Sequence, residues 1–118
     1  MIIKDTSLEE YNLNLRDKTI KQLIILTEIL QLDENTLKVA VAFLDQALQF
    51  CDYLEADLII LGITCLHLSQ KLHEKNELSL QTILDKANWL FQTTLIDVAI
   101  IQFECFLTKE VLDFNFNI

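Results

Sequence analysis

Residues 58–68 decide the fold: they read LIILGITCLHL and form the longest apolar stretch of the chain. A membrane span needs about 20 apolar residues, so a stretch of this length suits a helix inside a folded core. Its β-branched residues would also suit a strand. We interpret it as a helix, because no turn signal interrupts it and the chain lacks strand neighbours. A helix that is apolar all round must be surrounded by other helices.

The composition also favours an all-α fold. The chain of 118 residues contains no proline and a single glycine, Gly62. A sheet protein of this length would normally need several such residues for its hairpin turns. The sequence is 52% hydrophobic and 23% charged, which is typical of a folded domain rather than a disordered segment. We therefore expect one all-α domain.

Helical periodicity predicts four more helices around the central one. The first covers residues 15–31 and the second residues 36–50, with polar residues between them that can cap the second. The central helix begins near residue 55 and turns polar at residues 69–71. Ser79 is the expected N-cap of the fourth helix.

The fifth helix is expected from Leu95 to about Leu112. Thr94 and Asp97 have the spacing of a capping box at its start. Val98, Ile101 and Cys105 recur at helical spacing and lie near one face, together with Val111. The sequence shows no internal repeat, linker or low-complexity segment.

Net charge and cysteine content narrow the classes of partner and compartment. Nine basic and 18 acidic residues give a formal charge of −9, which disfavours binding to nucleic acid or to an anionic membrane. The acidity is interpreted mainly as a source of solubility, with a basic partner as the alternative. Residues 1–15 are polar and acidic, unlike a signal peptide. The three cysteines are interpreted as buried apolar residues. We expect a soluble, intracellular protein, cytoplasmic or nuclear.

No catalytic or metal-binding pattern is present. The sequence lacks GxGxxG, GxxxxGK[ST], HExxH and CxxC. His67 and His73 are six residues apart, so they point away from each other on a helix. His67 is interpreted as a hydrogen-bonded histidine of the core. We expect no enzyme activity, no cofactor and no metal.

Four charged residues interrupt apolar helical faces: Arg16, Asp45, Lys71 and Glu104. Charged groups are rarely buried unless they are paired. Two acids and two bases in such positions suggest ion pairs, for example Arg16 with Asp45. In the alternative interpretation, each side chain extends to solvent at the edge of its helix. The pattern alone leaves both open.

These charges carry a resemblance to a known family. Arg16 near the head of the first helix, followed by residues 33–48 (DENTLKVAVAFLDQAL), resembles the first cyclin box, in which an arginine precedes a segment containing LDRFL. Residues 61–74 (LGITCLHLSQKLHE) resemble the family's segment that contains LVG, ASK and a pair of glutamates. Residues 104–114 resemble the segment that closes the box. The resemblance runs from about Leu15 to the end.

The resemblance implies a five-helix cyclin-box bundle around a central buried third helix. It assigns residues 15–118 to this domain and residues 1–14 to a polar extension. Arg16 and Asp45 match a buried structural ion pair of cyclins. Lys71 and Glu104 match the lysine and glutamate that hold the backbone of a kinase's C helix, and we add Glu74 to this partner-binding set. The implied function is that of a cyclin-like regulatory subunit, which binds and activates or positions a cyclin-dependent-type protein kinase in cell-cycle or related kinase regulation.

The sequence departs from the family's pattern in ways that keep an alternative open. Many cell-cycle cyclins carry an apolar substrate-docking patch on the first helix, whereas this chain has residues 15–19 (LRDKT) and Gln22 there. We expect docking of that kind to be lost. Gln46 replaces an arginine, His73 replaces one of the paired glutamates, and a second box is absent from the sequence. The alternative function is a cyclin-fold scaffold subunit of a larger assembly, without kinase activation.

Overall fold

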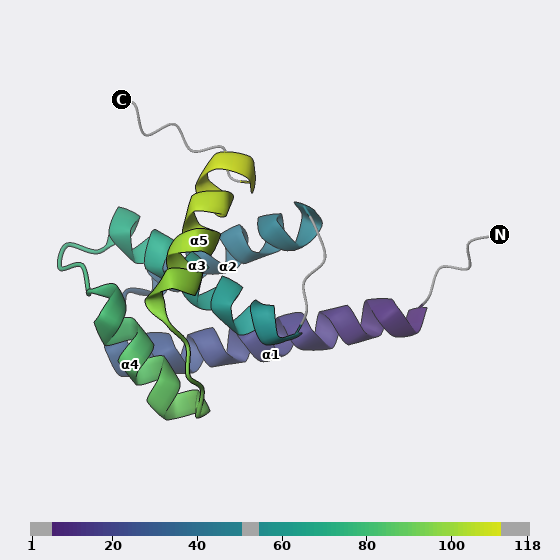
Figure 1. Cartoon of the computed structure of the whole chain (residues 1–118), viewed down its shortest axis with the longest axis horizontal. Helices are drawn as coiled ribbons and strands as arrows, with labels where there is room; N and C mark the ends of the chain where they lie inside the picture. The colour runs from purple at the N-terminus through teal and green to yellow at the C-terminus, as the bar shows by residue number, and fades with distance from the viewer. Residues whose placement is uncertain (1–5, 51–54, 112–118) are drawn as a thin grey trace.

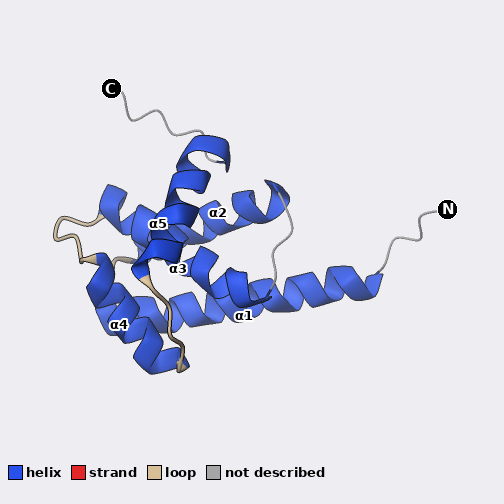
Figure 2. Ribbon diagram, viewed as in Figure 1, coloured by secondary structure: helices blue, strands red, loops and turns tan. Residues whose placement is uncertain are grey.

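The computed structural model describes residues 6–50 and 55–111, and these ranges are helical with short connections and no strands (Figures 1 and 2). The elements in chain order are α1 (Thr6–Leu30), α2 (Glu34–Phe50), α3 (Glu55–His73), α4 (Leu80–Phe91), α5 (Asp97–Phe106) and a short π-helical segment, η1 (Leu107–Val111). The predicted all-α class and the five helices are confirmed. None of the helices in the described ranges has the length and apolar character needed to cross a membrane.

α3 is the central helix, as the apolar stretch predicted. Leu58 and every residue from Leu61 to Gln70 are buried. Figure 1 shows α3 in the middle of the molecule, with α5 crossing in front of it, α2 beside it and α1 along one side. All four of the other α-helices contact it. The core therefore forms around a helix that has no solvent-facing side over most of its length.

α1 is longer than the sequence predicted. It begins at Thr6, not near Leu15, so most of residues 1–14, interpreted as a polar extension, continue the first helix. No proline or glycine stands between Thr6 and Leu15 to interrupt the helix. The polar residues before Leu15 were interpreted as an extension that precedes the first helix. Their polarity is equally compatible with an amino-terminal helical segment.

The connection between α3 and α4 is fixed by side chains from the end of α3. Gln70 is fully buried, and its amide bonds both the backbone nitrogen and the backbone oxygen of Leu78. Ser69 donates to the backbone oxygen of Thr36 at the start of α2. Ser79 caps α4 as predicted, since its hydroxyl accepts from the backbone nitrogen of Thr82. The carboxyl end of α3 is thereby held in a defined position.

The predicted capping box at Thr94 is wrong. The residue that precedes α5 is Ile96, and no side chain caps the helix. Asn88 of α4 explains the difference, because its amide bonds the nitrogen and the oxygen of Leu95 and accepts from the Thr93 hydroxyl. These bonds tie residues 93–95 to α4, and the helix begins only after them.

The face predicted for the fifth helix lies at the surface. Val98 and Ile101 are each 53% exposed, and Cys105 is exposed, whereas Ile100 and Leu107 are buried. Of the three cysteines interpreted as buried, Cys65 is buried and Cys105 is exposed, so the prediction is wrong for Cys105, while Cys51 lies outside the described residues. Periodicity identified a real apolar stripe on α5. It could not tell which side of the helix faces the core.

A candidate partner-binding face

Lys71 and Glu104 meet at the carboxyl end of α3. The Lys71 Nζ atom donates to Oε1 of Glu104 at 2.9 Å. The Glu104 side chain is 15% exposed and that of Lys71 38%, so the acid is mostly covered while the base reaches water. The pair joins α3 to α5, as the resemblance implied for two residues on one face. A surface ion pair of this kind contributes little to stability by itself.

His67 approaches the same carboxylate oxygen from the buried side. Its side chain is 7% exposed, and its Nδ1 atom lies 3.2 Å from Oε1 of Glu104. The distance is that of a hydrogen bond, but the contact is not aligned as one, so Nδ1 is buried without a hydrogen-bond partner. The core histidine predicted from the sequence is therefore buried but not fully satisfied. Its contact with Glu104 was not foreseen.

The surroundings favour the ionised form of Glu104. Burial by itself would raise the pKa of this carboxyl group, because a charge loses solvation. The contacts with His67 and with Lys71 outweigh burial, and they lower the pKa below its ordinary value of 4.5. Glu104 is therefore a carboxylate near neutral pH, and its contacts with His67 and Lys71 of α3 favour that form.

Exposed apolar residues accompany the pair. Leu72 follows Lys71 in the chain and is 50% exposed. Ile101 precedes Glu104 by three residues on α5, which places the two side chains as neighbours on the helix. We call Lys71, Glu104, Leu72 and Ile101 the α3–α5 face. It combines a charged pair with exposed apolar side chains, and protein interfaces are built from both kinds of group.

Glu74, the third residue of the predicted partner-binding set, has a structural contact. Its Oε1 atom accepts from the backbone nitrogen of Asp33 at 2.6 Å and from the Thr36 hydroxyl at 2.8 Å. A carboxylate at the amino end of a helix satisfies free backbone donors and opposes the helix dipole. Glu74 thus ties the end of α3 to the start of α2. Contact of Glu74 with a partner stays a prediction.

Arg16 and Asp45 form the ion pair that the sequence suggested. The guanidinium Nε atom donates to one oxygen of Asp45 at 2.6 Å, and Nη2 donates to the other at 3.0 Å. The hydrogen bond to Asp45 raises the pKa of Arg16. The side chains are 31% and 39% exposed, so the pair is only half-buried, in contrast to the buried pair that the resemblance implied. It joins α1 to α2 at the surface.

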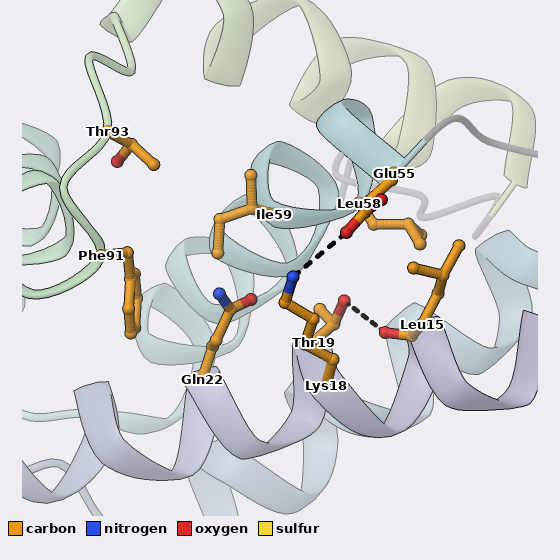
Figure 3. Close-up of a pocket in the computed structure, with 9 residues that line it drawn as sticks. All are labelled: Leu15, Lys18, Thr19, Gln22, Glu55, Leu58, Ile59, Phe91 and Thr93. Carbon is orange, nitrogen blue, oxygen red and sulfur yellow. Dashed lines mark hydrogen bonds and ion pairs between the residues drawn. The ribbon is translucent and has the colours of Figure 1, made fainter.

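A shallow pocket opens between α1, the amino end of α3 and the end of α4 (Figure 3). Lys18 and Glu55 form an ion pair of 3.1 Å beside it, and Gln22 and Phe91 line it. Lys18 and Gln22 are among the residues that differ from the family's apolar docking patch. The pocket is therefore polar on its α1 side. The expected loss of substrate docking stays a prediction.

Among the residues that the structure describes, no group of three or more histidine, cysteine, aspartate or glutamate side chains is arranged to hold a metal ion. Cys65 is buried, and burial raises the pKa of its thiol. A raised pKa disfavours the thiolate, which is the reactive form of cysteine. Cys65 is therefore interpreted as part of the core.

The fold and the α3–α5 face define an all-helical domain built around a buried central helix. Its sequence matches the family described as "Cyclin, N-terminal domain" over residues 2–117. The chain therefore belongs to the cyclin family. A search of curated proteins and a search of solved structures each find no match. Cyclin domains are regulatory and non-catalytic.

Sequence reasoning found Lys71 and Glu104 but missed Leu72 and the contact that the buried His67 makes with Glu104. Leu72 was not singled out, because one apolar residue at the end of a helix carries no pattern. The contact between His67 and Glu104 was missed because the residues lie on different helices. The signal available in the sequence was a histidine inside an otherwise apolar helix, which costs desolvation and so calls for a nearby partner.

Proposed function

We propose that this chain is a cyclin-like regulatory subunit that binds a cyclin-dependent-type protein kinase through the α3–α5 face. The observation that carries the proposal is the Lys71–Glu104 pair, in which Lys71 reaches water, together with the exposed Leu72 next to Lys71 in the chain and the exposed Ile101 one turn from Glu104. Family membership adds that domains of this type bind partner proteins, typically kinases.

The pair is suited to binding a helix backbone. A lysine that bonds one carboxylate oxygen retains further donors, and the second oxygen of Glu104 retains acceptor capacity. A partner helix can therefore receive a hydrogen bond from Lys71 and donate one to Glu104, while its apolar side chains cover Leu72 and Ile101. Burying these contacts from water would make the charged hydrogen bonds strong.

The mechanism would be a shift of conformational populations in the kinase. An active kinase requires its C helix to be placed so that a glutamate of that helix pairs with the catalytic lysine. A subunit that binds this arrangement better than the inactive one increases its population. The chain itself would contribute no catalytic group. Activation and mere positioning of the kinase differ in whether this shift suffices for activity.

A quantitative pull-down tests the proposal. The full chain carrying an affinity tag is used to recover partners, with the Lys71→Ala variant as the control. We expect a protein kinase in roughly equimolar amount with the parent chain, reduced with the variant, and kinase activity that rises as the chain is added. Recovery of structural subunits without a kinase would contradict the proposal. That result would favour a scaffold role.

A further inference from the structure

His67 occupies a buried position of α3 at which an apolar side chain such as leucine would pack at a lower cost in free energy. The residues next to it on α3, from Leu61 to Leu68, form a buried and mostly aliphatic core. An imidazole ring with a buried Nδ1 atom that has no aligned hydrogen bond costs free energy, whereas a leucine would fill similar space without that cost. A residue that is unfavourable for packing suggests a role elsewhere.

Among the residues that the structure describes, the ionisable side chain in contact with His67 is that of Glu104. The Nδ1 atom of His67 and Nζ of Lys71 approach the same oxygen, Oε1, at 3.2 Å and 2.9 Å. Both contacts are made to Oε1, and a carboxylate has a second oxygen, Oε2, that can also accept hydrogen bonds. His67 cannot follow Glu104 toward solvent, because its side chain is 7% exposed and packed in the core. Lys71, in contrast, is free to turn toward a partner.

We infer that His67 is a positioning residue, which holds Oε1 of Glu104 from the buried side so that Lys71 and Oε2 are presented to the bound partner. The inference rests on the proposed function, since it assigns Glu104 and Lys71 to a partner interface. When a partner's carbonyl group draws Lys71 away, His67 remains to hold the carboxylate. Without His67, Glu104 would face the partner with one contact fewer and a less defined orientation.

Apart from His67 and Lys71, the described charged groups on the elements that pack against α5 form no ion pair with Glu104. The elements that pack on α5 are α3, α4 and η1. Glu104 forms ion pairs with His67 and Lys71 of α3, whereas Asp85 and Lys86 of α4 and Lys109 of η1 are in none with it. Of the groups described, only His67 and Lys71 therefore support the ionised Glu104. Removing one of them leaves the other as sole support.

The first measurement needs no partner. The pKa of Glu104 is followed by carbon-13 NMR of its carboxyl group in the parent chain and in His67→Leu. We expect the pKa to rise in His67→Leu, because the burial that raises it stays while a contact that lowers it is lost. His73→Leu is the matched control, since this second histidine of α3 is exposed and contacts the Ser69 carbonyl. It should leave the pKa of Glu104 unchanged.

The second measurement separates positioning from packing. His67→Leu should melt within a few degrees of the parent, because leucine fills similar space without leaving a cavity and Glu104 keeps its contact with Lys71. Its affinity for a purified kinase domain of the cyclin-dependent type should nevertheless fall, by roughly threefold to thirtyfold, as expected for neighbouring groups that act together. His67→Asn, which can place an amide nitrogen near the position of Nδ1, should recover part of that affinity.

The outcomes distinguish the inference from the proposed function. If the pKa of Glu104 is the same in His67→Leu and the parent, the inference fails, whether or not a kinase binds. It also fails if that pKa rises while the affinity for the kinase stays at the parental value. If the parent binds no kinase at all, the proposed function fails and the interface part of the inference fails with it, while the NMR titration still decides whether His67 holds Glu104.

Discussion

The Arg16–Asp45 pair joins α1 to α2 where both side chains still meet water, at 31% and 39% exposure. A fully buried pair would make Asp45→Ala cost about 3–5 kcal/mol, because it would leave an arginine desolvated and unpaired. In the observed position, water can solvate the free guanidinium group. The bidentate geometry adds to the strength of the pair, but exposure reduces its effect on stability.

We expect Asp45→Ala to lower the free energy of unfolding by about 1 kcal/mol. Urea denaturation of the parent and the variant measures this difference. The double variant with Arg16→Ala should lose little more than the single variant, because the same contact is removed. A loss above about 3 kcal/mol would show that water does not reach the pair.

Glu104 gives the stability of the domain a dependence on acid pH. Its pKa is lower in the folded chain than its ordinary value of 4.5, so the ionised group stabilises the fold. That contribution is fully present above the unfolded value and is lost as the pH falls through the lowered pKa of the folded state. The sign follows because the unfolded chain binds the proton more readily.

The comparison of the parent with Glu104→Gln isolates this contribution. The parent should be the more stable of the two from about pH 7 to about pH 5, and the difference should shrink as the pH falls further below 4.5. Thermal melts of both proteins over this range provide the measurement. A difference that stays constant down to about pH 3 would mean that the contacts with His67 and Lys71 do not favour the ionised form.

At the scale of the helices, α1 and α3 approach closely at Gly62. A β-carbon at this position would lie 2.8 Å from Cγ2 of Thr19, which is too short for two carbon atoms. Thr19 cannot turn away freely, because its hydroxyl donates to the backbone oxygen of Leu15. The single glycine of the chain is therefore required by packing, despite the usual cost of glycine inside a helix.

Gly62→Ala should destabilise the domain by about 1 kcal/mol, since overpacking outweighs the gain in helix propensity. Thr19→Ser removes Cγ2 and keeps the hydroxyl, so it supplies the matched background. In that background, Gly62→Ala should be neutral or stabilising. Thermal melts of the four proteins test the pairing, and an increase in stability from Gly62→Ala in the parent would contradict it.

The helices show why some of the fold could be predicted and some could not. Residues 58–68 predicted a central helix, because an apolar surface on all sides has only one arrangement in a helical bundle. The predicted starts of α1 and α5 were wrong, because hydrophobic periodicity does not determine either of them. α1 begins in a polar segment that is helical, and the start of α5 depends on the hydrogen bonds between Asn88 and Leu95.

The site was predictable to a similar extent. Lys71 and Glu104 were identified because charges in apolar surroundings call for partners, and because they match a family pattern. The half-exposure of Arg16 and Asp45, the bonds of Glu74 to the start of α2 and the contact of His67 with Glu104 follow from how separate helices pack. No spacing within one helix reports such contacts.

At the scale of the whole molecule, four helices surround α3 and its carboxyl end carries the charged centre of the α3–α5 face. The acidic chain also presents apolar side chains beside this pair. The arrangement supports a domain whose function is to hold a partner. We propose that Lys71 and Glu104 bind that partner together, as one hydrogen-bonded pair.

The most direct test is a double-mutant cycle on partner affinity. Lys71→Ala, Glu104→Ala and the double variant are titrated against the kinase recovered with the parent chain, with Lys18→Ala as the control on the opposite, α1 side of α3. Each single variant should bind at least about tenfold more weakly, while melting within a few degrees of the parent. The double variant should lose much less than the product of the two effects, because one network is broken twice, and Lys18→Ala should change affinity little. Parental affinity in both single variants would contradict the claim and assign binding to another surface.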